Sequence, residues 1–112
     1  MYQGTTPALK LVVTEDITNC TVYVTFRDVK HGTIYTWTNH DPEFLGMHLD
    51  NDEKETEILL RLTQAETLAL SRGCIEIQVR FIDAEGIAGA TDIGRVENLE
   101  ALYKQEIKYT EG

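Results

Sequence analysis

Two segments of the chain place an apolar side chain at every second position, and this pattern constrains the fold more than any other feature. The first runs from Cys20 to Arg27 and the second from Cys74 to Ile82. Because side chains of a β-strand point alternately to opposite faces, each segment is predicted to be a strand with one buried face. The positions predicted to face the core are Cys20, Val22, Val24, Phe26, Ile75, Ile77, Val79 and Phe81.

The same alternation separates the two cysteines. Cys20 is in phase with the apolar residues of its segment, whereas Cys74 is in phase with Glu76, Gln78 and Arg80. Residues in opposite phase lie on opposite faces of their strands. We therefore expect both thiols to be reduced rather than joined in a disulfide.

Further strands are indicated by short apolar or β-branched runs bounded by turn residues. These segments are 8–13, 33–38, 47–49, 56–62 and 87–96. They add Leu11, Ile58 and Leu60 to the expected core. Thr63 and Glu66 have the spacing of a capping box, which predicts one helical turn before the strand at residue 74. Gly73 is the expected end of that turn.

A series of about seven short strands with one helical turn predicts an all-β protein, an immunoglobulin-like antiparallel β-sandwich. At 112 residues the chain has room for one such domain, which we place at residues 1–96. Residues 97–112 are predicted to form a C-terminal tail. The spacing of its apolar residues fits either an amphipathic helix or an added strand.

This tail carries more large apolar side chains than a free solvated end requires. They are Leu99, Leu102, Tyr103, Ile107 and Tyr109. Two roles remain open: the tail binds a partner, such as a neighbouring subunit of a homo-oligomer, or it folds back on its own domain.

Two aromatic residues, Tyr35 and Trp37, are candidates for an exposed binding surface on one predicted strand. Aromatic side chains on a sheet face can bind a ligand or a sugar ring, so a ligand- or carbohydrate-binding module is the alternative function. The competing interpretation places both rings over one end of the core.

Composition and motifs argue against several other classes of function. The net charge of -9 would repel nucleic acid and anionic lipid surfaces. The sequence has no secretory signal and no apolar run long enough to span a membrane, so we expect synthesis in the cytoplasm. The three histidines lie near predicted loops without zinc-site spacing, and Lys54 interrupts the acidic run 50–55 where calcium would need an oxygen ligand. Without a nucleophile motif or phosphate-binding loop, we expect no enzyme and no cofactor.

Several segments resemble small phage and prophage virion proteins, in particular the N-terminal domains of phage baseplate upper proteins. The resembling segments are 2–9, 22–26, 62–68, 76–80 and 90–93. The resemblance implies a non-catalytic β-sandwich module of a tail or baseplate that docks with other virion proteins, is made in the host cytoplasm and resides in the virion. It implies no active-site residue. The longer relatives carry a stalk and a receptor-binding part, which we do not expect in this chain.

Overall fold

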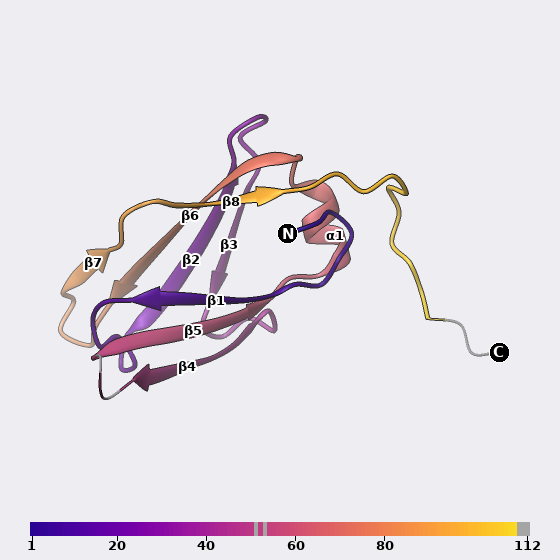
Figure 1. The fold of residues 1–112 in the computed structure, drawn as a ribbon. Coiled ribbons are helices and arrows are strands. Elements are labelled where there is room, and N and C mark those ends of the chain that lie inside the picture. Colours follow the sequence, from indigo (N-terminus) through magenta and orange to yellow (C-terminus); the bar gives the residue numbers. More distant parts are fainter. Residues whose placement is uncertain (51, 53, 110–112) are drawn as a thin grey trace.

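The computed structural model describes residues 1–50, 52 and 54–109, and Figure 1 shows their arrangement. The elements in chain order are β1 (Ala8–Val13), β2 (Thr21–Asp28), β3 (Ile34–Thr38), β4 (Phe44–Asp50), β5 (Glu55–Arg61), α1 (Gln64–Ala69), β6 (Gly73–Ile82), β7 (Ala88–Ala90) and β8 (Gly94–Asn98). All of the strand pairs are antiparallel.

The strands form two packed sheets, which confirms the predicted all-β sandwich. One sheet has the order β1-β5-β4 and the other the order β3-β2-β6, with β7 and β8 both paired to β6. Strand β8 pairs with the first half of β6 and β7 with its last three residues, so the two lie end to end along one edge. This arrangement corresponds to strands B-E-D and C′-C-F-G of immunoglobulin-like sandwiches.

Two predicted strands differ in extent from those observed. The segment 87–96 forms two strands rather than one, because the pairing with β6 changes at Thr91. This residue binds β6 through its side chain as well as its backbone. Val79 N donates to Thr91 Oγ1 (3.1 Å), and Thr91 N donates to Val79 O (2.9 Å). Strand β4 begins at Phe44, earlier than the predicted start at residue 47. A bulge between Phe44 and Gly46 interrupts its pairing with β5, which hides the period-two pattern.

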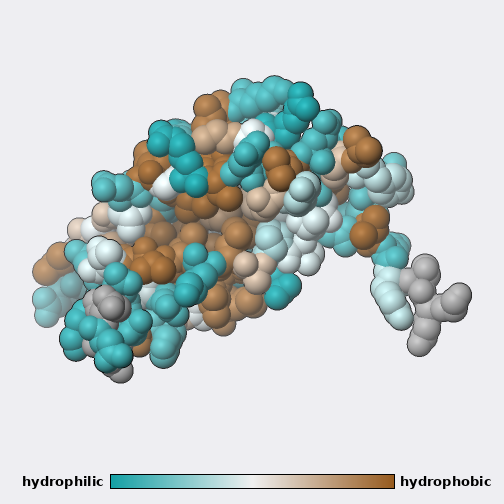
Figure 2. Space-filling view, in the orientation of Figure 1, coloured by the Kyte–Doolittle hydropathy of each residue, from teal (hydrophilic) through white to brown (hydrophobic). Residues whose placement is uncertain are grey.

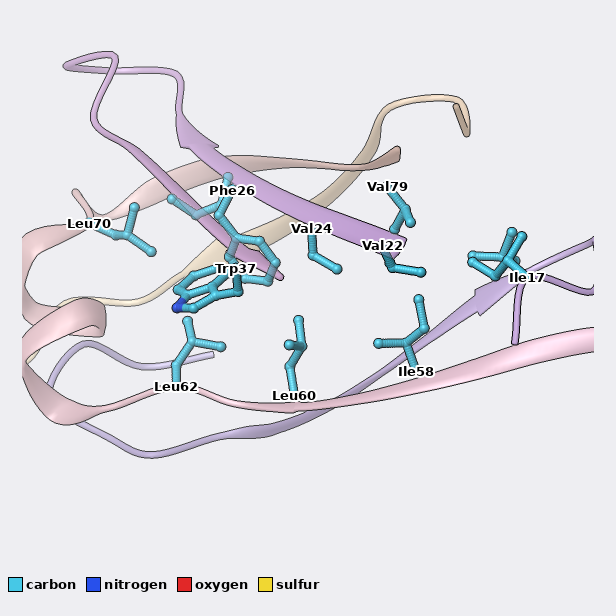
Figure 3. Close-up of a cluster of buried hydrophobic side chains, with 12 residues drawn as sticks. Ile17, Val22, Val24, Phe26, Trp37, Ile58, Leu60, Leu62, Leu70 and Val79 are labelled. Carbon is cyan, nitrogen blue, oxygen red and sulfur yellow. The ribbon is translucent and has the colours of Figure 1, made fainter. Parts of the chain in front are cut away.

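The core lies between the two sheets, and most of the predicted positions are buried in it (Figure 3). Leu11, Cys20, Ile77 and Phe81 are half-buried instead and pack against its margin. The core also contains residues outside the predicted set: Val13, Ile17, Trp37, Leu62 and Leu70. Ile17 is in a connection rather than a strand, and its backbone N–H donates to Thr56 Oγ1, so strand periodicity does not reveal its burial.

Helix α1 begins with the predicted capping box. Thr63 Oγ1 accepts from the Glu66 backbone N–H (3.2 Å), and Glu66 Oε1 accepts from the Thr63 backbone N–H (2.7 Å). The helix ends at Ala69, earlier than predicted, and Leu70 is buried against the core after it. Gly73, with a φ of 111°, begins β6 rather than ending the helix.

Both cysteines are free, in agreement with the prediction from strand phase. Cys20 is half-buried and packs against the core, whereas Cys74 is exposed on the other face of its sheet.

Candidate interaction site

The C-terminal tail leaves the sandwich beside the N-terminus. Leu99 N donates to Met1 O (2.7 Å), and Gln3 N donates to Leu99 O (2.9 Å). The Met1 ammonium donates to Glu97 O (2.7 Å). Residues 1–3 thus form a short parallel ladder with the end of β8, and the paired structure extends past residue 96 to Leu99.

Asn98 anchors the start of the tail to the segment that follows α1. Its buried side-chain amide nitrogen lies 3.0 Å from Leu70 O and 3.3 Å from the carbonyl oxygens of Thr67 and Ser71. The Gln3 amide also donates to Leu70 O, at 2.9 Å. Two side chains from opposite ends of the chain therefore satisfy the carbonyl groups at the end of α1.

Beyond Leu99 the tail is held by two glutamines and by an ion pair between Arg72 and Glu100 (3.0 Å). Gln3 Oε1 accepts from Ala101 N (3.3 Å) and from Lys104 Nζ (2.9 Å). Gln64 binds both backbone groups of Ile107: its Oε1 accepts from Ile107 N (2.7 Å), and its Nε2 donates to Ile107 O (2.9 Å). Neither glutamine was singled out in the sequence, because a contact between residues so distant along the chain leaves no local pattern.

The tail forms neither the helix nor the added strand that its apolar spacing left open. Residues 100–109 are irregular, and Figure 1 shows them running past α1 and away from both sheets.

The apolar side chains of the tail face solvent. Leu102 is 95% exposed, Tyr109 92%, Ile107 65% and Tyr103 63%. Leu99 differs from these four, because it is half-buried within the ladder with residues 1–3. Of the five residues predicted to bind a partner, four are therefore accessible to one in the folded chain.

A second accessible surface is the seam, which we define as the surface between β1, the edge strand of one sheet, and β7 and β8 of the other sheet, which Figure 1 shows facing it. Figure 2 shows hydrophobic residues gathered along the middle of this face. Five inward-facing side chains beside the seam are half-buried, whereas Val13 at the end of β1 is buried. The five are Leu9, Leu11, Ile77, Phe81 and Val96. A hollow of about 380 Å³ lies at one end of it, lined by Val12, Val13, Thr14, Glu15, Phe81, Ala90, Thr91 and Asp92.

The predicted aromatic surface is wrong for Trp37. The indole is 3% exposed and packs edge-on against Phe26, with ring centroids 4.9 Å apart. Tyr35 stacks on it at 5.8 Å and is itself half-buried. The indole N–H donates to Glu66 Oε2 (2.7 Å), so α1 covers the polar edge of the ring. Both rings follow the inward phase of β3, opposite Val24 and Phe26, and close the core.

Acidic side chains collect at the end of the sandwich where β1 and β4 finish and β2 begins. They are Glu15, Asp16, Asp50, Asp52, Glu55, Asp83, Glu85 and Asp92. Burial raises the pKa of the Cys20 thiol above its ordinary value, and the negative charges of Asp83, Asp16 and Glu15 raise it further. This end appears hydrophilic at the lower left of Figure 2.

The described residues contain no group of three or more His, Cys, Asp or Glu side chains that could hold a metal ion. His31, His40 and His48 are each exposed. The acidic run 50–55 lies partly outside the described residues. Within the described part of the chain, α1 is too short to cross a lipid bilayer, and no other helix there is a candidate span.

Comparison with known proteins assigns no family to this arrangement. No family model matches the sequence, and no curated protein matches it.

Proposed function

We propose that the protein is a non-catalytic structural module that joins a larger assembly through residues 99–109. One observation carries this proposal: the tail presents Leu102, Tyr103, Ile107 and Tyr109 to solvent, while Gln3 and Gln64 accept hydrogen bonds from its backbone at Ala101 and Ile107. Burying apolar surface contributes about 25 cal/mol per Å². Large side chains kept exposed on an anchored segment are therefore a favourable binding element.

The assembly we propose is a phage or prophage virion, with the protein as a tail or baseplate component. The support is the resemblance of its strand and turn segments to small virion proteins. In this setting the partners are other virion proteins and further copies of the same chain, and the protein would reach the virion after synthesis in the bacterial cytoplasm.

The alternative function, a carbohydrate- or ligand-binding module, loses its main support. Such a module needs an exposed aromatic platform, and Trp37 is enclosed by Phe26, Tyr35 and the Glu66 carboxylate. A sugar ring could not stack on it without opening the core.

The proposal is tested by removing residues 102–112. Cutting there keeps Asn98, the Leu99 ladder and the contact of Ala101 with Gln3, so the sandwich should stay folded. We expect the full chain to be oligomeric and the shortened chain to be monomeric by light scattering.

Trp37 fluorescence serves as the control for folding, because the indole lies inside the core and contacts Phe26, Tyr35 and Glu66 rather than the tail. A full chain that is already monomeric at its highest soluble concentration, or a shortened chain that keeps the oligomer, would contradict self-assembly through the tail.

A further inference from the structure

The three-stranded sheet has one strand fewer than its counterpart in constant-type immunoglobulin domains. There the sheet has the order A-B-E-D, whereas here β1-β5-β4 supplies only B-E-D. The place of strand A is beside β1. Within the described part of the chain, β1 pairs with β5 alone, and no hydrogen bond joins it to β7 or β8. The outer edge of β1 therefore offers free backbone groups to another strand.

The inner side chains at this edge are incompletely covered. Leu11 and Phe81 face the interior from the two sheets yet remain half-buried, whereas Ile58 and Leu60 on the central strand β5 are fully buried. A strand placed beside β1 would cover the seam and its hollow. Glu15 and Asp92 line the hollow at the acidic end, so a strand with positive charge would suit that position.

The tail contains a segment with the required pattern. From 103 to 109 the side chains alternate: Tyr103, Gln105, Ile107 and Tyr109 share one phase, and Lys104, Glu106 and Lys108 share the other. In an extended conformation one face is mainly apolar and the other charged, with two lysines against one glutamate. This segment is net positive in a chain whose net charge is -9.

The tail cannot easily reach the seam of its own domain. Residues 1–3 occupy the edge of β8 where the tail departs, which blocks a direct hairpin back along β8. Gln3 and Gln64 then direct residues 101–107 past α1, away from β1. A neighbouring molecule meets neither obstacle.

We propose that residues 103–109 of a second copy of this chain add as a strand beside β1 and close the seam. Backbone hydrogen bonds to β1 provide affinity, as in other cases of strand addition, and the alternating side chains provide register. Tyr103, Ile107 and Tyr109 face Leu11 and Phe81, while the lysine at one end of the added strand, Lys104 or Lys108, lies near the acidic end. This inference rests on the proposed function and identifies both the partner and the receiving surface.

Disulfide trapping between full-length chains tests the placement. In a background with Cys20→Ser and Cys74→Ser, one protein carries Lys10→Cys on the outward phase of β1. The other carries a single cysteine at position 104, 106 or 108 of the tail. Directly opposed residues of neighbouring strands have Cβ atoms about 5 Å apart, within reach of a disulfide.

We expect one tail position to form a mixed disulfide with Lys10→Cys on mild oxidation, at least about tenfold faster than with Thr36→Cys. Thr36 is the matched control, because it is an exposed outward residue of β3, the edge strand of the other sheet.

A pair of charge variants tests the alternation in the full chain. Ile107→Asp would place a carboxylate in the apolar seam and should weaken self-association by at least about tenfold. Val29→Asp adds the same charge at another exposed apolar residue, in the β2–β3 turn and outside both the tail and the seam, and should leave association nearly unchanged. Both side chains are exposed in the single chain, so neither change should unfold it.

The outcomes separate this inference from the proposed function. An oligomer that depends on the tail but gives no preferential disulfide with Lys10→Cys overturns the seam as the receiving surface and leaves assembly through the tail intact. A monomeric full chain overturns self-assembly through the tail and this inference with it. An intrachain disulfide in a monomer carrying both Lys10→Cys and Lys108→Cys shows that the tail covers its own seam, and overturns the role of the second copy.

Discussion

The Asp28 carboxylate joins two parts of the fold. It is 1% exposed, and its oxygens accept from the backbone N–H groups of His31 (2.6 Å) and Ser71 (3.2 Å). The first contact closes the β2–β3 hairpin, and the second ties the hairpin to the segment after α1. Burial alone would raise the pKa of this carboxyl, but the hydrogen bonds from His31, Ser71, Thr33 and Gly32 outweigh it and hold the pKa below its ordinary value.

Asp28→Asn should therefore destabilise the protein by about 1–3 kcal/mol at neutral pH. A carboxyl whose pKa is lower in the folded state stabilises the fold above its unfolded pKa, about 3.9, and this contribution is lost as the pH falls through the folded pKa. The difference between the two proteins should thus shrink in acid below about pH 4. Urea unfolding followed by Trp37 fluorescence, repeated across this pH range, measures it.

Asp52→Asn is the matched control, since it removes the same charge from an exposed turn. Its effect should stay within about 0.5 kcal/mol. Equal losses for the two variants, or a loss at Asp28 that does not decrease in acid, would mean that the buried hydrogen bonds do not stabilise the fold as described.

At the scale of elements, α1 depends on one glutamate for two contacts. Glu66 Oε1 completes the capping box with Thr63, and Glu66 Oε2 accepts the hydrogen bond from the Trp37 indole. Thr63→Ala should cost about 1 kcal/mol of unfolding free energy, the usual value of an N-cap. Glu66→Ala should cost more, because it also leaves the buried indole N–H without a partner.

Glu66→Gln separates these contributions, because an amide oxygen can still accept one hydrogen bond. We expect it to recover part of the loss in denaturant melts. A Glu66→Ala protein no less stable than Thr63→Ala would show that the indole contact contributes nothing beyond the cap.

The sequence pattern predicted those strands and helix ends that depend only on neighbouring residues. β1 and β6 follow the expected bounds closely because their alternation is uninterrupted, and the capping box needs only Thr63 and Glu66. The division between β7 and β8 was not predictable, since Thr91 pairs with Val79 only once β6 lies beside it. For Trp37 the sequence left two alternatives, the surface and the core. The alternation of side chains along a short strand does not reveal that α1 covers one edge of the indole.

At the scale of the whole molecule, the sequence predicted which tail residues are apolar but not how the tail is held or what lies open beside it. Gln3, Gln64 and Asn98 act only when both ends of the chain meet at α1. The seam, likewise, follows from the pairing of β1 with β5 and not with β8. Such long-range pairings depend on the sheet order, which strand periodicity does not specify.

The core is therefore closed around Trp37 and less completely covered along the seam. Substitutions of two phenylalanines, one in each region, can test this difference in burial. Phe26 is fully buried and packs against the indole, whereas Phe81 is half-buried beside Gly89 at the seam. Phe26→Ala should cost about 3–5 kcal/mol, and Phe81→Ala about half as much because less of its surface leaves water on folding. Urea melts at low protein concentration, where association is negligible, compare the two. Equal losses would mean that Phe81 is fully covered within one molecule, and the seam would then have no apolar surface left to offer a second chain.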